Sequence, residues 1–319
     1  MPVSGFVLAW YRPTIGFVAC GPGWEGPVTE PSTVGVIGAS SLVGRCAIPL
    51  LANGGHAVVA FSRKLRNPQP VFGVSWRQLA APGAGPVGAT AIEEWLCLAP
   101  IWVLPQYFDM MAAHGARRVV ALSSTSRFTK VGSSESADSA VAAQLAKGEA
   151  DLKTWAAANR VEWVILRPTL IYGLGQDKNL TEIARFVRRF SFFPLIANAT
   201  GLRQPIHVQD AAMVCVAALG VPVAANHEYN IAGQEALPYK EMVRRIFLAA
   251  GLRPRLITIP LFVFRAALAC LRVLPKYRSW SVAMAERMQK DMVFDCSDAV
   301  RDLGFSPRVF AFGPEDFPR

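Results

Sequence analysis

The sequence has no C-x-x-C pair and no cluster of cysteine and histidine residues. Its six cysteines lie far apart, and it has four histidines in 319 residues. This scarcity argues against a zinc site and against a disulfide scaffold, so we expect no metal centre and a reducing compartment. Charged residues are also scarce, at 18% against 52% hydrophobic residues. That balance excludes intrinsic disorder, and the length allows a sizeable core.

Acidic residues are outnumbered, with 23 Asp and Glu against 33 Lys and Arg, which gives a net charge of +10. A basic balance suits a phosphate-rich ligand, an anionic membrane surface or nucleic acid. No nucleic-acid-binding module is recognisable by motif, so we expect no nucleic-acid partner. A predicted helix carries Arg185, Arg188 and Arg189 on one face. Most such basic faces are only solvated, so we do not interpret this one as a nucleic-acid site.

Two apolar stretches are candidates for targeting or membrane segments, and both depart from the usual patterns. Residues 1–32 have no basic residue ahead of their apolar patch and many glycines and prolines, so we expect an irregular extension. The segment 256–274 is interrupted by one proline and two arginines, whereas a spanning helix needs about 20 mostly apolar residues. We expect a buried or half-buried helix there, beginning at Leu261 after a short strand. The alternative is a helix lying on a membrane, with peripheral contact through 256–278.

From residue 33 onward, short apolar runs alternate with helical patterns. Strands are expected at 33–38, 57–61, 117–122, 161–168, 228–233 and 256–260, a further apolar run covers 95–104, and helices are expected at 42–53, 105–115, 140–159, 179–190, 209–219 and 239–250. Strands that alternate with helices imply a parallel sheet covered on both faces, a doubly wound α/β fold. Ligands of such folds bind outside the carboxyl ends of the strands.

The most informative stretch is G-V-I-G-A-S-S-L-V-G at 35–44, where a strand ends, a tight turn follows and a helix begins. The first N–H groups of such a helix, with its dipole, favour a diphosphate. In G-x-x-G-x-x-G loops the middle glycine lets the backbone approach phosphate closely. Here Gly38 and Gly44 hold the outer positions and Ser41 replaces the middle glycine. The alternative is a tight turn without a ligand.

The second expected strand is followed by Ser62, Arg63 and Lys64 rather than by an acidic residue. An acidic residue near this position would bind the ribose hydroxyls of NAD, whereas an arginine accommodates a 2′-phosphate. Arg63, helped by Lys64, therefore favours NADP(H) over NAD(H). The alternative is a solvated pair of surface charges.

Five stretches together resemble a known family in their order along the chain: G-A-S-S-L-V-G (38–44), S-R-K (62–64), A-L-S-S-T-S (121–126), I-L-R-P-T-L-I-Y-G (165–173) and R-Q-P-I-H-V-Q-D (203–210). The family is the extended and atypical short-chain dehydrogenase/reductases, the NAD-dependent epimerase/dehydratase group that includes nucleoside-diphosphate-sugar epimerases. The resemblance implies a Rossmann NAD(P)-binding domain at 33–175 and a smaller C-terminal substrate lobe at 176–319. It also implies that 227–233 returns to the Rossmann sheet.

The resemblance implies roles for individual residues. Thr125, or Ser124 if the loop shifts by one position, would be the catalytic hydroxyl that hydrogen-bonds a substrate oxygen. Lys147 would be the lysine of the family's Y-x-x-x-K pair, which binds the nicotinamide ribose. Arg203 and Tyr172 would lie on the substrate side. The cofactor would contact Gly38, Ala39, Ser40, Ser41, Leu42, Val43, Gly44, Arg63, Lys64, Ala99, Lys147, Pro168 and Thr169.

The chain departs from the family pattern at the catalytic tyrosine. The position four residues before Lys147 is Ala143, and no tyrosine occurs between Tyr107 and Tyr172. In this family the tyrosine is the general acid/base, and proton transfer of that kind contributes about 10² to 10⁴ in rate. Either another group moves the proton, or the chain binds cofactor without the usual chemistry. In the second case Lys147 is a solvated helical lysine.

Three residues of the last motif have simple structural interpretations. His207 is expected to be a packed histidine beside a strand. Asp210 is expected to be a helix N-cap. Arg203 lies either near a substrate diphosphate or in a surface salt bridge.

The sequence is compatible with three functions. The first is a cytoplasmic NAD(P)-dependent oxidoreductase or epimerase acting on a nucleotide sugar or a related carbonyl or hydroxyl compound, with a homodimer as a possible assembly. The second is a non-catalytic assembly or accessory protein that holds NADP(H), similar to an accessory subunit of respiratory complex I. The third is a membrane-surface enzyme acting on a lipid-linked substrate, peripheral to the inner membrane. Fold analogy alone does not choose among them.

Overall fold

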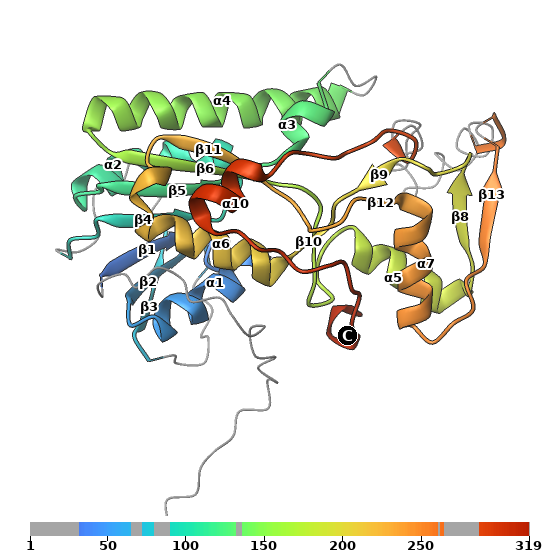
Figure 1. The fold of residues 1–319 in the computed structure, drawn as a ribbon. Coiled ribbons are helices and arrows are strands. Elements are labelled where there is room, and N and C mark those ends of the chain that lie inside the picture. Colours follow the sequence, from blue (N-terminus) through green and yellow to red (C-terminus); the bar gives the residue numbers. More distant parts are fainter. Residues whose placement is uncertain are drawn as a thin grey trace, which may run out of the picture.

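The computed structural model describes residues 32–64, 72–79, 90–131, 136–260, 262–264 and 287–318. Seven strands form one parallel sheet (Figure 1). They are β1 (Thr33–Ile37), β2 (Ala57–Ser62), β3 (Val74–Gln78), β4 (Glu94–Cys97), β5 (Arg118–Leu122), β6 (Glu162–Pro168) and β11 (His227–Ile231), in the order β11-β6-β5-β4-β1-β2-β3. The chain winds outward from β1 in one direction and from β4 in the other. The expected doubly wound α/β fold is therefore confirmed, with its switch point between β1 and β4.

Helices cover both faces of this sheet (Figure 1). On one face lie α1 (Leu42–Asn53) and α6 (Val208–Gly220), together with α10 (Ser297–Leu303). On the other lie η1 (Ile101–Tyr107), α2 (Phe108–Ala113) and α4 (Ser136–Asn159). Side chains alternate along each strand, so the same strand supplies both cores. The nearly continuous apolar strands follow from this two-sided burial.

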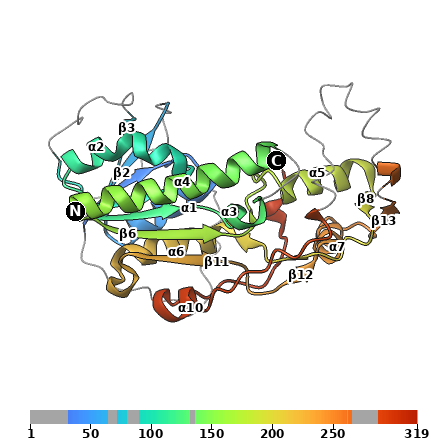
Figure 2. The same ribbon diagram turned by 90° about the horizontal axis from the view of Figure 1, so that it is seen from above.

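A smaller lobe lies beyond the carboxyl ends of the strands (Figures 1 and 2). It has its own hydrophobic core, around the helices α5 (Leu180–Phe190) and α7 (Tyr239–Ala249). Its short strands are β7 (Ile171–Tyr172), β8 (Phe193–Ile196), β9 (Leu202–Arg203), β10 (Ile206–His207), β12 (Leu237–Pro238) and β13 (Leu256–Ile259). Three further short helices occur elsewhere along the chain: α3 (Ser126–Thr129), η2 (Pro222–Ala224) and η4 (Pro314–Asp316). β13 pairs with β8 in parallel, and β12 pairs with β9 antiparallel.

The lobe is discontinuous in the sequence. After β10 the chain returns to the large sheet through α6 and β11, and β11 pairs with β6. It enters the lobe again at β12. The boundary at 175/176 stays a proposal, because α6 follows it in sequence and yet packs against α1 on the large sheet.

Several elements differ in detail from the sequence-based expectation. The apolar run 95–104 is split, because Pro100 separates β4 from η1, and the helix expected to open at Pro105 instead starts as η1 at Ile101. The helix expected at 140–159 begins at Ser136. β3 was not expected, since its half-exposed sequence V-S-W-R-Q has no apolar run. Residues 1–31 and most of the helix expected after 260 lie outside the described residues.

Candidate cofactor and substrate site

The loops after five parallel strands meet at one edge of the sheet. Gly38 follows β1, Arg63 follows β2, Ala99 follows β4, Thr125 follows β5, and Pro168 ends β6. Direct contacts join two pairs of these loops. A Cβ added to Gly38 would lie 2.4 Å from the backbone nitrogen of Ala99. The backbone N–H of Thr125 donates to the carbonyl of Pro168 at 3.0 Å. This edge includes the switch point, where doubly wound folds bind ligands.

The turn between β1 and α1 needs its two outer glycines for its own packing. Gly38 has φ of +83°, which L side chains rarely adopt. A Cβ on Gly44 would lie 2.5 Å from the carbonyl oxygen of Gly38. The N–H of Ser41 donates to that same carbonyl at 2.8 Å and closes the turn. The tight turn by itself therefore explains both glycines, whether or not a ligand binds there.

Ser41, which replaces the middle glycine, is the N-cap of α1. Its hydroxyl oxygen accepts from the N–H of Gly44 at 3.0 Å. A helix leaves its first N–H groups without intrahelical acceptors, and the cap satisfies one of them. The N–H groups of Leu42 and Val43 remain at the helix start, beside the exposed Ser40. These residues fit a diphosphate, with one donor already engaged by the cap.

Arg63 and Lys64 are exposed at the end of β2, the strand next to β1. The backbone carbonyl of Arg63 accepts from Nε2 of Gln78 at 3.3 Å. The main chain at Arg63 is thus held while its side chain stays at the surface, one strand away from the glycine turn. This position suits a cation that contacts an adenosine 2′-phosphate.

Thr125 and Ser124 follow β5 and differ in accessibility. Thr125 is buried, and its hydroxyl donates to the carbonyl of Pro168 at 3.1 Å. Ser124 is half-buried, and its hydroxyl oxygen accepts from the N–H of Ser126 at 3.1 Å. The Ser124 oxygen is an acceptor in that bond, so its own proton can be donated elsewhere. Ser124 is therefore better placed than Thr125 to reach a substrate oxygen. Thr169, after β6, donates its hydroxyl to the carbonyl of Gln204.

Lys147 lies on the exposed side of α4. Its side chain is 75% exposed and pairs with Asp151 one turn along α4, at 2.6 Å. The sheet-facing side of the helix carries Leu145 and Glu149. Lys147 lies two residues from each, which is about 200° of rotation around the helix axis. Ala143 is exposed as well, so both positions of the Y-x-x-x-K alignment lie on the exposed side of α4, and a contact between Lys147 and the cofactor stays a proposal.

Glu149 is the charged residue that the sequence analysis missed. It is almost fully buried, and its carboxylate accepts a hydrogen bond from the hydroxyl of Ser123 at 2.5 Å. Ser123 is the residue before Ser124. Arg167 of β6 donates to both of its carboxylate oxygens, at 3.0 and 2.6 Å, and Arg127 pairs with it too. An arginine in the apolar strand V-I-L-R-P needs a buried acidic partner, and that requirement was readable from the sequence.

Tyr172 is fully buried between the lobe and the C-terminal residues. Its hydroxyl donates to the carbonyl of Ala311 at 3.1 Å, and His207 packs edge-on against its ring, with 5.2 Å between centroids. Burial raises the pKa of the Tyr172 hydroxyl above its ordinary value. The tyrosine therefore acts here as a packed residue. A contact between Tyr172 and substrate stays a proposal and would need a rearrangement of the C-terminal segment.

Arg203 is buried, so the surface salt bridge considered for it is wrong. Its Nη1 donates to the carbonyls of Leu202 and Lys290, both at 2.8 Å, and its Nη2 donates to the carbonyl of Arg287. Burial lowers the pKa of this guanidinium from its ordinary value. In this structure the side chain joins β9 to the segment 287–290. A role toward a substrate diphosphate stays a proposal.

The start of α6 is capped differently from the expectation. The N-cap is His207, whose Nδ1 accepts from the N–H of Gln209 at 3.3 Å, so the assignment of the cap to Asp210 is wrong. Asp210 lies in the first turn and accepts from the backbone N–H and guanidinium of Arg308. His207 is buried, as expected for a packed histidine, and its Nε2 lies 3.5 Å from Oδ1 of Asp316.

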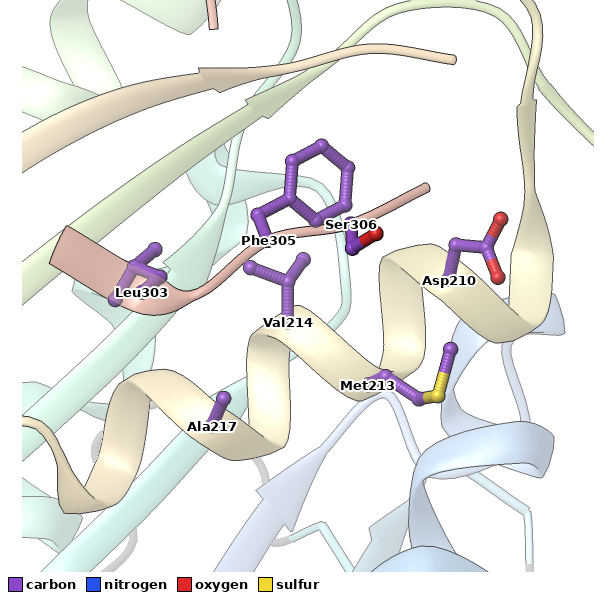
Figure 3. Close-up of a pocket in the computed structure, with 7 residues that line it drawn as sticks. All are labelled: Asp210, Met213, Val214, Ala217, Leu303, Phe305 and Ser306. Carbon is purple, nitrogen blue, oxygen red and sulfur yellow. The ribbon is translucent and has the colours of Figure 1, made fainter. Parts of the chain in front are cut away.

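A small cavity lies between α6 and the C-terminal segment (Figure 3). Its volume is about 40 Å³, and it is lined by Asp210, Met213, Val214, Ala217, Leu303, Phe305 and Ser306. Pockets for small molecules usually measure about 300–1,000 Å³. This cavity is too small for a nucleotide, and none of its lining residues belongs to the loops that follow β1, β4 and β5.

Among the residues that the structure describes, no three His, Cys, Asp or Glu side chains converge on a point where a metal ion could bind. The same part of the chain contains no helix with the length and apolar character needed to cross a bilayer.

Known proteins resemble this chain in sequence. Residues 106–232 match the family described as NAD dependent epimerase/dehydratase. Among curated relatives, UDP-glucose 4-epimerase of Vibrio cholerae is 24% identical over 51% of this chain and 48% of that protein. The NADH dehydrogenase (ubiquinone) 1 alpha subcomplex subunit 9, mitochondrial, of Arabidopsis thaliana is 28% identical over 34% of this chain and 27% of that protein. The matches thus span about half or less of these relatives.

Solved structures resemble the chain over most of its length. UDP-glucuronic acid 4-epimerase from Bacillus cereus, in complex with NAD, has a TM-score of 0.66 at 16% identity, covering 90% of this chain and 97% of that one. UDP-glucose 4-epimerase of Thermotoga maritima, with UDP-glucose, has a TM-score of 0.62 at 12% identity, covering 86% and 93%. At such identities the likeness establishes the fold. The chain therefore has the α/β fold of these epimerases, and its residues 106–232 match the family described as NAD dependent epimerase/dehydratase.

Proposed function

We propose that the chain is an enzyme of the nucleotide-sugar epimerase type that binds a nicotinamide dinucleotide across the carboxyl ends of β2, β1, β4 and β5. The observation that carries this proposal is the convergence of the glycine turn, Arg63, Ala99 and Ser124 on one edge of the sheet. The cofactor would supply hydride acceptance and return. Leu42 and Val43 would hold the diphosphate through their N–H groups, and Ser124 would donate a hydrogen bond to a substrate oxygen.

We propose NADP(H) rather than NAD(H) as the preferred cofactor. The exposed Arg63 and Lys64, with no acidic residue beside them at the end of β2, support this preference. The structural relative from Bacillus cereus is in complex with NAD, so this preference would distinguish the chain from that relative. A nucleotide sugar is the proposed substrate class, because the Vibrio cholerae and Thermotoga maritima relatives are UDP-glucose 4-epimerases.

A second function is favoured by one observation, the orientation of α4. Its sheet-facing side presents Leu145 and Glu149, while Lys147 and Ala143 face outward, so no tyrosine–lysine pair lies beside Ser124. This arrangement suits a protein that holds NADP(H) without turning it over. The partial similarity to the Arabidopsis subunit of NADH dehydrogenase points the same way.

Two measurements on the purified full chain separate these functions. The first is identification of any nucleotide released on denaturation. The second is incubation with UDP-glucose and UDP-glucuronic acid, followed by chromatography of the sugars and absorbance at the reduced-nicotinamide band. Epimerised sugar, or transient reduction of the cofactor, supports the enzyme. Tightly held NADP(H) that no sugar reduces or oxidises supports the binding protein, and the absence of any nucleotide binding refutes both.

The expected homodimer and cytoplasmic location also stay proposals. Analytical ultracentrifugation of the purified chain tests the first, and fractionation of cells tests the second.

A further inference from the structure

The far end of the lobe presents an exposed surface along β13. In both views β8 and β13 lie at the end of the lobe opposite the large sheet (Figures 1 and 2). β13 pairs with β8 on one side, and the backbone N–H of Phe193 donates to the carbonyl of Arg255, which joins the end of α5 to the start of β13. We call this region the β13 surface. It consists of Arg189, Phe190, Arg253, Arg255, Ile257, Phe262 and Val263.

Large apolar side chains are exposed on this surface. The exposed fraction is 48% for Phe190, 50% for Ile257 and 74% for Phe262. They are held by a rigid base, because Phe190 packs on Phe186 with ring centroids 4.6 Å apart and Phe264 is buried in the core of the lobe. Isolated exposed apolar residues need no explanation, but several along one edge indicate an interaction site.

The charge of this surface is entirely positive. Arg189, Arg253 and Arg255 are exposed, and the Arg189 guanidinium lies over the Phe190 ring at 5.4 Å from its centroid. The two chain segments that meet here contain no acidic residue: no Asp or Glu occurs between Glu182 and Asp210, or between Glu241 and Glu286. The net charge of +10 does not by itself explain why these two segments lack acidic residues, because the chain has 23 acidic residues elsewhere.

We infer that the β13 surface docks the protein on an anionic lipid bilayer, with Phe190, Ile257 and Phe262 entering the headgroup region and the arginines contacting lipid phosphates. Apolar insertion combined with basic residues is the chemistry of peripheral membrane binding. The arginines would also contact a nucleic acid, but that partner would leave the aliphatic side chains of Ile257 and Val263 exposed to water. This inference goes beyond the proposed function and does not depend on it, because the surface is remote from the carboxyl edge of the sheet.

The experiment is co-sedimentation of the full chain with vesicles at about 0.15 M salt, where surface charges farther apart than about 8 Å are largely screened. Neutral phosphatidylcholine vesicles are compared with vesicles containing about 30% phosphatidylglycerol. We expect binding to the anionic vesicles only. Arg253→Glu/Arg255→Glu should weaken it at least about tenfold, because each basic residue near an anionic surface contributes about 1 kcal/mol.

Matched variants control for net charge and for apolar content. Arg117→Glu/Arg160→Glu makes the same change in net charge at exposed positions beside β5 and α4, and should retain binding. Ile257→Ser/Phe262→Ser should weaken binding, whereas the exposed pair Val223→Ser/Val300→Ser should not. Nucleotide titration and circular dichroism verify that each variant is folded.

Four outcomes overturn the inference. They are no binding to anionic vesicles, equal binding to neutral ones, equal losses in the two charge-reversal variants, and unchanged binding in Ile257→Ser/Phe262→Ser. If heparin competes fully and the serine pair has no effect, the surface binds soluble polyanions instead. Because nucleotide binding is measured on the same variants, a failure of the membrane inference is distinguishable from a failure of the proposed function.

Discussion

Arg167 and Glu149 form a buried ion pair that joins β6 to α4. Nε and Nη2 of Arg167 lie 3.0 and 2.6 Å from the two carboxylate oxygens. The pair turns Glu149 toward the sheet and leaves Lys147 on the opposite side of the helix. The hydroxyl of Ser123 donates to the same carboxylate, so the pair also holds the loop that carries Ser124. The geometry of the candidate site therefore depends on a residue outside the family's Y-x-x-x-K pattern.

Glu149→Ala should strongly destabilise the fold. Removing one partner of a buried pair typically costs about 3–5 kcal/mol. Glu228 would still lie 2.8 Å from Nη2 of Arg167, so the loss should fall toward the lower end of that range. We expect a loss of that size in the free energy of unfolding measured in urea. Lys147→Ala, on the same helix, breaks only an exposed pair with Asp151 and should cost less than about 1 kcal/mol. Equal losses in the two variants would contradict the orientation of α4.

Gly38→Ala should destabilise the chain more than a matched glycine substitution. At Gly38 an added Cβ meets both a φ of +83° and the backbone of Ala99 at 2.4 Å. At Gly251 φ is +70° and nothing lies within 4 Å of the added Cβ. The left-handed conformation alone costs roughly 1–2 kcal/mol. Gly251→Ala should lose about that much free energy of unfolding, measured by chemical denaturation, and Gly38→Ala should lose clearly more. A smaller loss at Gly38 would refute the close approach to Ala99.

Asp138 should give the fold an acid-sensitive contribution to stability. Burial by itself would raise the pKa of this carboxyl, but Lys130 at 2.7 Å and the guanidinium of Arg287 outweigh it and lower the pKa below its ordinary value of 3.8. A lowered folded pKa stabilises the native state above the unfolded pKa, and this contribution is lost as pH falls through the folded pKa.

Asp138→Asn should therefore reduce the free energy of unfolding at pH 7, by about 1–3 kcal/mol for a largely buried pair. The difference from wild type should persist down to about pH 5 and shrink as pH falls below the ordinary value of 3.8 toward the lower folded pKa. Urea titrations at several pH values measure it. A difference that grows toward low pH would show that the sign is wrong.

Much of the fold could be predicted from the sequence because local signals were strong. The helix at Leu42–Asn53 was predicted to the residue, since the glycine turn and Asn53-Gly54-Gly55 mark its two ends. The strand at 228–233 was correctly expected and forms most of β11 beside β6. β3 was missed because it is half-exposed, and its parallel pairing with β2 is set by tertiary contacts.

The candidate site was less predictable because it depends on rotation and burial rather than on order in the chain. Lys147 was assigned by its resemblance to the lysine of the family's Y-x-x-x-K pair, whereas the orientation of α4, which exposes Lys147 and buries Glu149 against Arg167, could not be predicted. Arg203 lies in a motif typical of substrate contact, yet its guanidinium donates to three backbone carbonyls. Sequence alone does not show which side of a helix meets a sheet when both sides carry charges.

The binding of nicotinamide nucleotide at the carboxyl edge is tested most directly by fluorescence titration with NADPH and NADH. Wild type is compared with Arg63→Ala, with Lys147→Ala and with the exposed control Arg117→Ala. Losing a charge-assisted phosphate contact costs about 1.5–3 kcal/mol. Arg63→Ala should therefore weaken NADPH binding about 10- to 150-fold while leaving NADH and both other variants near wild type. Equal affinities for the two nucleotides with no effect at Arg63, or an equal loss in Lys147→Ala, would contradict the account.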